Sequence, residues 1–573
     1  MGLSKTTFLR CLVFGALLNT VATAGAVAAR IELVDGSTLN GTADCPPAGN
    51  CTVHLNSGQS FDVPPSAIRS IGGFGTPAAP GTSPAPSSSP LTVAPPAPQP
   101  PPAPESPPAP VPAASGSDNG LRVAGSNTIG AQLMPALLID YARSKGAADT
   151  ATVPVAAEEV TLTPNPAIAG LWPRMDVRAP GSGFGFKSLA ALAAGRQGAG
   201  DARQKLEAFA AGQPEADIAM ASRKIKPEET AVLASLGALD DPNSEHVIAL
   251  DGLAIIVNPA NSAGALSIDQ IKGIFTGTIG DWSQVGGVPG PISLYARKDG
   301  SGTLDTFKDI VLQGAALSPN ATRIEDSREL SAAVARDAGA IGFVGVAYVG
   351  EAKAVSIREC NLTYAPSKFN IKTEEYPLSR RLFLYTPADS SPAIADFIRY
   401  TNSDSAQKVA SDNDFVDLEV ESDSSGSQNS RRAAALATAD QPHPADNFAT
   451  ITRHAERLSL TLRFRTNTHD LDRADLDSRA IHDVDRLAAY MNSPEGHGHR
   501  LLLIGFSDSE GNYRYNTDLS RSRAHYVADR LKKHGITVAD SDIYGFGPAL
   551  PVACNTTDNG KAKNRHVEVW MTR

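Results

Sequence analysis

The stretch "ARKDGSGTLDTF", residues 296–307, places one arginine four residues ahead of a Ser-Gly-Thr and just before a helix-like run. Arg297 offers a rigid fork of N–H donors, Ser301 and Thr303 offer hydroxyls, and Gly302 lets the backbone approach a ligand closely. The N–H groups at the start of a helix have no intrahelical partner and carry partial positive charge. Donors that converge in this way are typical of a site for a buried oxyanion, although Ser-Gly-Thr is also ordinary loop chemistry.

Three other turns between a strand and a helix offer the same chemistry, in "VAGSNTIG", "APGSGFGFKSLAAL" and "ADIAMASRKIKPEE". Their polar residues are Ser126, Asn127 and Thr128, then Ser182, then Ser222 and Arg223. Ligands of open α/β sheets bind beyond the carboxyl ends of the strands. A single turn of this kind is most often helix capping, but four of them favour one shared anion site. Asp299 could fix the arginine of the first stretch by pairing with it.

These turns belong to a region, residues 118–420, in which strand-like and helix-like segments alternate. Apolar runs such as "HVIALDGLAIIVNP" and "GAIGFVGVAYVG" alternate with helical stretches such as "SLAALAAG" and "SPAIADFIRYTN". This alternation predicts an α/β fold for the region.

Six segments of this region, "AGSNTIG", "ADIAMASRKIKPEE", "LDGLAIIVNPAN", "IKGIFTGTIGDWSQVGG", "RKDGSGT" and "SRRLFLYTP", follow one another in the order seen in periplasmic phosphate-binding proteins of ABC importers. Nearly all of residues 120–420 resembles that family. The resemblance implies a type II periplasmic-binding-protein fold, with two α/β lobes that close on a hinge over dehydrated phosphate. The candidate oxyanion-binding residues are Ser126, Asn127, Thr128, Ile129 (through its backbone N–H), Ser182, Ser222, Arg223, Arg297, Ser301, Gly302 and Thr303.

One position departs from the pattern of that family. Well-studied phosphate binders have a carboxylate where this chain has Ser222, directly before Arg223. The carboxylate accepts the proton of hydrogen phosphate and repels fully deprotonated sulfate. A serine hydroxyl accepts a hydrogen bond but does not repel sulfate in that way, and Arg223 could add a second cation. The sequence therefore favours phosphate and leaves sulfate or another oxyanion open.

Residues 446–573 show a second α/β pattern. The segments "RLSLTLRF", "RLLLIGF" and "HVEVWM" read as strands. The predicted helices between them carry apolar residues at helical spacing, which are Ala480, Val484, Leu487, Ala488 and Met491 in one and Ala524, Val527, Ala528 and Leu531 in the other. The second helix stops at Gly535.

Two charged residues of this unit suit a zwitterionic ligand. Asp508 follows a strand in a glycine-bounded loop, and Arg523 lies fifteen residues later in the next helix. A carboxylate and a guanidinium that share a pocket can hold an ammonium and a carboxylate. The alternative is a structural salt bridge between loop and helix.

The unit resembles the C-terminal domain of OmpA, which binds peptidoglycan and has a βαβαβ fold. The matching residues are Asp508, Asn516, Leu519, Ser520, Arg523, Ala524, Asn564 and Arg565, and His566 stands where a second arginine is common. The resemblance implies that Asp508 and Arg523 hold the free end of diaminopimelate in the peptide stem.

The N-terminus predicts export. Residues 1–28 have basic residues, an apolar run and then small residues, as in a secretory signal peptide with cleavage after Ala24, Ala26 or Ala28. Residues 29–75 read as short alternating strands of a small β-barrel, with a local disulfide between Cys45 and Cys51. No later segment approaches the length and hydropathy of a transmembrane helix.

Two stretches read as linkers that join these units. Residues 76–117 are rich in proline and favour an extended spacer, and residues 421–445 are rich in serine and small residues. Cys360 and Cys554 lie in different predicted domains. They form either an interdomain bridge or two free, buried thiols, and we favour the free thiols.

The composition agrees with a multidomain, mainly α/β protein of the periplasm. A chain of 573 residues exceeds one core, and its net charge of −10 argues against nucleic acid as the main partner. No Ser-His-Asp set, metal-ligand cluster or pair of carboxylates indicates an enzyme, and no cofactor is expected. We expect a peptidoglycan-associated protein at the inner side of the outer membrane, with an ABC permease as a possible partner. The alternative is an envelope scaffold or sensor whose binding lobes do not serve transport.

Overall fold

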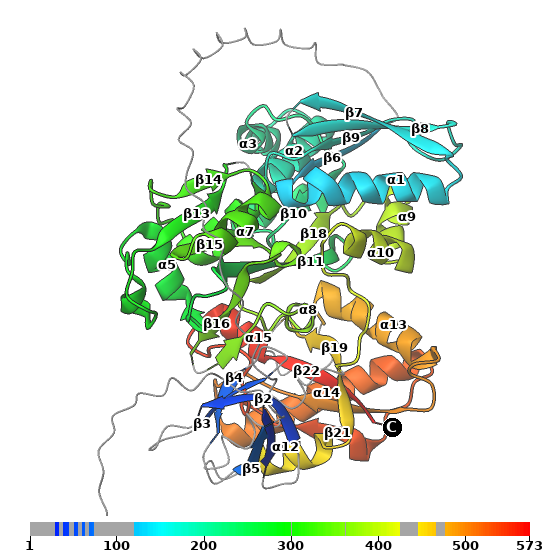
Figure 1. Cartoon of the computed structure of the whole chain (residues 1–573). Helices are drawn as coiled ribbons and strands as arrows, with labels where there is room; N and C mark the ends of the chain where they lie inside the picture. The colour runs from blue at the N-terminus through cyan, green and yellow to red at the C-terminus, as the bar shows by residue number, and fades with distance from the viewer. Residues whose placement is uncertain are drawn as a thin grey trace, which may run out of the picture.

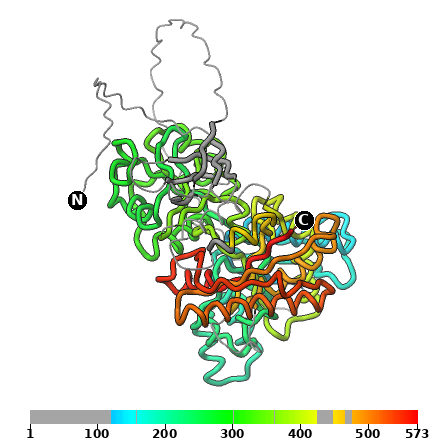
Figure 2. The backbone as a smooth tube through the Cα atoms, turned by 90° about the horizontal axis from the view of Figure 1, so that it is seen from below, coloured from blue at the N-terminus to red at the C-terminus, as the bar shows by residue number. Residues whose placement is uncertain are grey.

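The computed structural model describes the strands between residues 29 and 73, residues 120–423 apart from 157, 300 and 361, and residues 445–465 and 476–572. The predicted signal peptide, most of both predicted linkers and the predicted Cys45–Cys51 disulfide lie outside the described residues. The middle part of the chain, cyan to yellow-green in Figure 1, lies against the orange and red C-terminal part. In Figure 2, seen from below, the orange and red C-terminal part overlies the middle part.

The middle part consists of two lobes, as the resemblance implies. Lobe one has a mixed sheet in the order β7-β8-β9-β6-β10-β18-β11. Its central parallel strands are buried on both faces, which explains their continuous apolar sequence. The strands are β6 (Leu121–Gly125), β7 (Asp149–Ala156), β8 (Glu159–Asn165), β9 (Met175–Arg178), β10 (Ile218–Ala221), β18 (Ser379–Tyr385) and the first half of β11 (Glu245–Val257). The principal helices are α1 (Met134–Ser144), α2 (Ser182–Arg196), α3 (Asp201–Ala210), α9 (Pro392–Thr401) and α10 (Asp404–Asp412).

Lobe two is built on the second half of β11, which pairs with β15 and β16. Its strands are β12 (Ala265–Ser267), β13 (Ser293–Arg297), β14 (Thr322–Ile324), β15 (Ala340–Gly345), β16 (Lys353–Glu359) and β17 (Leu362–Tyr364). Its helices are α5 (Ile268–Thr276), α6 (Gly302–Phe307) and α7 (Ser327–Arg336). A capping box of Ser267 and Gln270 begins α5, and Gly277, at φ 83°, ends it.

Two crossings join the lobes. The first is β11 itself, whose residues 245–252 pair with β18 in lobe one and whose residues 253–257 pair with β15 in lobe two. The second is residues 373–378, here called the hinge segment, which run from α8 (Lys368–Lys372) to β18. The hydroxyl of Tyr376 donates to the carbonyl of Leu253 at 2.7 Å, so the two crossings are bonded to each other.

The C-terminal domain is a four-stranded sheet in the order β19-β22-β20-β21 with helices packed against it. Its elements are α12 (Ala445–Thr452), β19 (Ala455–Arg463), α13 (Ser478–Asn492), β20 (Arg500–Gly505), α14 (Tyr513–Lys533), β21 (Ile543–Gly545), α15 (Asp558–Asn564) and β22 (His566–Thr572). The predicted apolar faces of α13 and α14 are buried, with Val484, Leu487 and Val527 at 1% exposure or less. The predicted strands and helices are confirmed.

The N-terminal strands pair antiparallel in the order β5-β1-β2-β3-β4. They are β1 (Ala29–Leu33), β2 (Thr38–Asp44), β3 (Cys51–Leu55), β4 (Ser60–Val63) and β5 (Ile68–Gly73). These strands match the predicted β segments, while a closed barrel stays a prediction.

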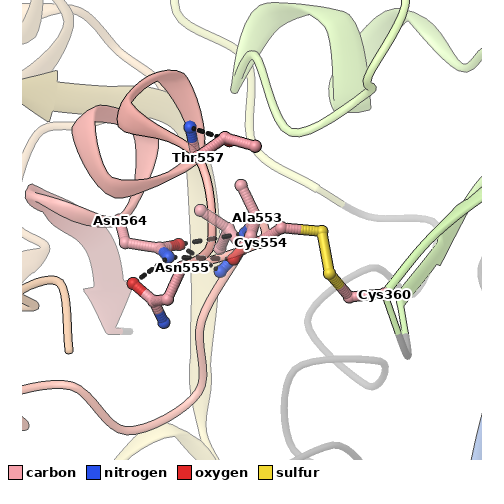
Figure 3. Close-up of a disulfide and its surroundings, with 8 residues drawn as sticks. Cys360, Ala553, Cys554, Asn555, Thr557 and Asn564 are labelled. Carbon is pink, nitrogen blue, oxygen red and sulfur yellow. Dashed lines mark hydrogen bonds between the residues drawn. A yellow bond between two sulfur atoms is a disulfide. The ribbon is translucent and has the colours of Figure 1, made fainter.

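The preferred interpretation of Cys360 and Cys554 as free, buried thiols is wrong. The structure joins them in a disulfide between the end of β16 in lobe two and the loop before α15 (Figure 3). Their positions are 194 residues apart, so only the docking of the C-terminal domain brings them together. No helix among the described residues combines the length and the hydropathy needed to cross a membrane.

Candidate functional site

Two adjoining cavities lie where the lobes meet, and the predicted oxyanion residues line them. One, of about 200 Å³, is lined by Ser126, Asn127, Thr128, Ser182, Ser222, Arg223 and Gly302, among others. The other, of about 610 Å³, is lined by Asn127, Thr128, Arg297, Ser301, Gly302 and Thr303, among others. Asn127, Thr128 and Gly302 belong to both, so they form the wall between the cavities. The structure therefore gathers the predicted side chains from four turns.

Two buried polar atoms of this site have no hydrogen-bond partner. These are the hydroxyl of Ser126, which is 1% exposed, and Nε of Arg297. Arg297 also donates through Nη1 to the hydroxyl of Ser327. Burial lowers the pKa of Arg297, and Asp326 partly offsets this effect. Buried donors without a partner are costly, so their presence is a reason to expect a ligand at this position.

The lobes touch at Thr128 and Gly302. The N–H of Gly302 donates to Oδ1 of Asn127 at 3.2 Å, and a Cβ atom on Gly302 would lie 2.0 Å from Oγ1 of Thr128. Only glycine permits this approach, because any side chain would collide with Thr128. The glycine of the Ser-Gly-Thr motif therefore allows lobe two to close against lobe one.

Two residues of the site were missed by the sequence analysis. Arg380 of β18 donates to Oγ1 of Thr128 at 2.7 Å and to the carbonyl of Gly302 at 3.2 Å, so it links the lobes. Asp251 of β11 holds the same guanidinium in an ion pair of 3.0 Å. The signal was present in the segment "SRRLFLYTP", whose arginines received no role.

The hydroxyls of Ser182 and Ser222 meet where the start of α2 faces the end of β10. The N–H of Ser222 donates to the hydroxyl of Ser182 at 3.1 Å, and the two hydroxyl oxygens are 3.3 Å apart. Arg223 forms two hydrogen bonds with Glu229, at 2.7 and 2.8 Å. Burial lowers the pKa of Arg223, but the hydrogen bonds and charge of Glu229 outweigh this and raise it. The charge of Arg223, which the sequence offers as a second cation for the anion, is therefore already paired with Glu229.

The structure bears on two further sequence-based expectations. Asp299 does not pair with Arg297, because its carboxylate contacts Lys308 at 3.2 Å and Arg323 at 3.4 Å. Ile129 is fully buried in the core of lobe one, and the predicted ligand contact through its backbone N–H stays a prediction.

The predicted peptidoglycan-binding pair, Asp508 and Arg523, lies near the carboxyl end of β20. Asp508 and Arg523 are each 1% exposed. Asp508 accepts a hydrogen bond of 2.8 Å from Arg565, and the guanidinium of Arg523 lies 5.3 Å from the ring centre of Phe464. Burial and the neighbouring Arg565 lower the pKa of Arg523 to about 10, although Asp508 acts in the opposite direction. One carboxylate and two guanidiniums therefore share one buried corner.

The other predicted peptidoglycan-binding residues hold the loops around Asp508 and Arg523. Asn516 donates to the carbonyl of Glu510 at 2.7 Å, and Ser520 accepts from the N–H of Gly547 at 2.9 Å. Asn564 accepts from the N–H groups of Val552 and Ala553. Leu519 is a buried apolar side chain. These contacts fix the loops around Asp508.

The comparisons with known proteins agree with both resemblances. Residues 188–405 match the model of a PBP superfamily domain, and residues 468–565 match that of the OmpA family. Phosphate-binding protein PstS of Bacillus subtilis (strain 168) is 31% identical over 32% of this chain and 62% of its own length. Phosphate-binding protein PstS of Staphylococcus haemolyticus (strain JCSC1435) is 31% identical over 40% of this chain and 72% of its own length.

The chain belongs to the PstS-like phosphate-binding protein family. It differs from a simple member because an OmpA-family domain follows the PstS-like lobes. Probable lipoprotein YiaD of Escherichia coli (strain K12) is 41% identical over 70 residues, which are 12% of this chain and 32% of YiaD. The match to the Bacillus PstS spans less than two thirds of that protein. Both matched families consist of binding domains and not of enzymes.

Proposed function

We propose that the PstS-like lobes bind phosphate or a related tetrahedral oxyanion, and that the OmpA-family domain holds the protein noncovalently on peptidoglycan. The observation that carries the first part is a pair of buried atoms without a hydrogen-bond partner, the hydroxyl of Ser126 and Nε of Arg297, at the meeting point of the lobes. Ser126 borders the smaller cavity and Arg297 the larger one, and an oxyanion bound in either cavity would accept a hydrogen bond from the donor that borders it and remove the cost of leaving that bond unmade.

The proposed anion contacts are the residues predicted from the sequence, with Arg380 as a positioning residue that holds Thr128. Because Ser222 supplies a hydroxyl in place of a carboxylate, we expect sulfate to compete with phosphate to a measurable degree. The N–H groups of Thr128 and Ile129, at the start of a helix, add donors that need no positive charge.

The second part rests on the buried corner of Asp508, Arg523 and Arg565. Diaminopimelate presents an ammonium and a carboxylate on one carbon, and this corner offers a group of opposite charge to each. The proposed location is the periplasm, at the peptidoglycan layer on the inner side of the outer membrane.

Calorimetry on the mature full-length chain, with phosphate and then sulfate, tests the anion site. Phosphate binding supports the proposal, whereas no binding of either anion favours the alternative of an envelope scaffold or sensor. Delivery to an ABC permease is a further proposal. It predicts that the purified chain stimulates ATP hydrolysis by such a permease only when the anion is present.

A further inference from the structure

The hinge segment carries two adjacent carboxylates that are held by the OmpA-family domain. Glu374 accepts hydrogen bonds from Arg463 and, at 2.7 Å, from Arg479. Glu375 accepts from Arg457. Glu374 and Glu375 are 6% and 1% exposed, so these contacts are buried. Three arginines of the OmpA-family domain therefore bind the two adjacent carboxylates of the hinge segment.

The same cluster of charges also contains a residue of lobe one. Arg381 of β18 donates to Glu374 at 2.6 Å and forms an ion pair of 2.8 Å with Asp477, at the start of α13. Burial raises the pKa of Glu374, but the arginines around it outweigh burial and hold the pKa well below its usual value, so the carboxylate stays charged. The backbone of Glu374 has φ 56°, a conformation that side chains other than glycine rarely adopt. In this conformation the carboxylate of Glu374 contacts Arg463 and Arg479 of the OmpA-family domain.

The same domain is attached to both lobes. On lobe one, the hydroxyl of Ser478 donates to Glu245 at 2.7 Å, and Arg486 donates to Asn402 at 2.6 Å. On lobe two, Cys554 is covalently joined to Cys360 at the end of β16 (Figure 3). The OmpA-family domain thus contacts both lobes on the side of the hinge.

Exchange of a ligand from a two-lobed binding protein requires the lobes to rotate about the hinge. A body fixed to both lobes and to the hinge opposes that rotation, because opening must break its contacts or move it with one lobe. The cleft is closed here, since Gly302 of lobe two meets Asn127 and Thr128 of lobe one.

We propose that the OmpA-family domain braces the two lobes in the closed arrangement, and that the Cys360–Cys554 disulfide is the tether that limits their opening. Reduction of the disulfide would leave lobe two joined to the OmpA-family domain only through noncovalent contacts and would speed anion exchange. The part of this inference that concerns the anion rests on the proposed function, while the part that concerns lobe opening does not.

The first test measures the dissociation rate of phosphate from the mature full-length chain by stopped flow. We compare the oxidised protein, the protein reduced with dithiothreitol after folding, and Cys360→Ser. Release is expected to be about 5-fold faster or more in the reduced protein and in the variant, the range typical of coupling between sites. Dithiothreitol added to Cys360→Ser is the matched control. It should have no further effect, which separates this disulfide from any other.

The second test is hydrogen exchange without any anion, followed by mass spectrometry of peptides. Reduction should speed exchange in the cleft, in peptides that contain residues 126–134 and 301–307. Acceleration confined to peptides around Cys360 and Cys554 would mean a local staple and would overturn the brace. If phosphate does not bind at all, the proposed function fails, and this test still decides the brace. If Cys360→Ser does not fold, the reduced wild type decides both measurements.

Discussion

The carboxylate of Glu374, in the hinge segment of the PstS-like lobes, accepts a hydrogen bond of 2.7 Å from Arg479 of the OmpA-family domain. Arg381 and Arg463 donate to the same carboxylate, so three guanidiniums surround one negative charge. A buried charge of one sign with partners of the other is stable as a set, but removal of one member leaves uncompensated charge in the interior. This makes Glu374 the most informative position for testing how the domains are joined.

Glu374→Gln is expected to destabilise the protein by about 3–5 kcal/mol, because three buried arginines would then face a neutral amide. The measurement is the free energy of unfolding in urea for the mature chain. Glu215→Gln is the matched control. It removes a carboxylate that pairs with Arg122 on the surface of lobe one, 2.6 Å away, and should cost about 1 kcal/mol or less. Equal losses in the two variants would contradict the importance of the buried cluster.

The site could be predicted from the sequence because its information is local. Each donor-rich turn, such as the one around Ser182 or Arg297, is written in a few consecutive residues that end a strand and begin a helix. The structure brings these turns to the boundary between the lobes, as the fold class required. Arg380 escaped prediction because its role depends on contacts with Thr128 and Gly302, which are far away in sequence.

The contact between the domains could not be predicted, and β19 shows the reason. Its polar positions alternate with leucines, a pattern that normally indicates one solvated face of a sheet. In the structure Arg457 is completely buried and Arg463 is 7% exposed, because that face packs against the hinge segment. Alternation identifies which residues are polar, but a polar face covered by another domain has the same pattern. The Cys360–Cys554 disulfide depends on the same docking.

The stability of the folded chain should depend on pH through His246 of β11. Burial lowers the pKa of His246 to about 4, with His482 of the OmpA-family domain as the second cause. The unfolded chain, with a pKa near 6.5, binds the proton first as the pH falls. The neutral histidine therefore makes its full contribution to the free energy of unfolding above pH 6.5. About 3 kcal/mol of that free energy is lost by pH 4.

His246→Gln should remove this part of the pH dependence and leave the part caused by carboxylates. Urea unfolding at intervals between pH 7 and pH 4 measures it, with wild type and variant side by side. The two curves should diverge most steeply between pH 6.5 and pH 4. Parallel curves would show that the pKa of His246 is not lowered in the folded protein.

Arg297→Ala should weaken phosphate binding by about 2–5 kcal/mol, which is a rise of thirty-fold or more in Kd, because a buried charge-assisted contact is lost. The folded state should persist, since Arg297 contacts Ser327 and is not part of a buried cluster of charges. Calorimetry measures the affinity. Arg196→Ala removes an exposed arginine that pairs with Asp389 in lobe one, and it should leave the affinity for phosphate unchanged. Unchanged affinity in Arg297→Ala would remove this residue from the site.

Ser222→Asp should weaken sulfate binding more than phosphate binding. The new carboxylate would lie beside the hydroxyl of Ser182, where it can accept the proton of hydrogen phosphate but only repels sulfate. Competition calorimetry of both anions on wild type and variant gives the selectivity. Ser222→Asn has nearly the same shape without the charge and serves as the control. A wild-type protein that ignores a large excess of sulfate would show that another group already supplies the discrimination.

Asp508→Ala and Arg523→Ala should each abolish pelleting of the mature chain with purified peptidoglycan. The ammonium and the carboxylate of diaminopimelate need both partners, because a ligand charge without a partner would be buried unpaired. The double variant should therefore be little worse than either single variant, and free diaminopimelate should compete at high concentration. Asp529→Ala, an exposed position on the same helix as Arg523, is the control and should pellet normally.

The hydrogen bond between Asp508 and Arg565 also predicts a lower melting temperature for Asp508→Ala, so melting curves must accompany the assay. A folded Arg523→Ala protein that still pellets would mean that the buried corner is a structural salt bridge and that the wall is bound elsewhere.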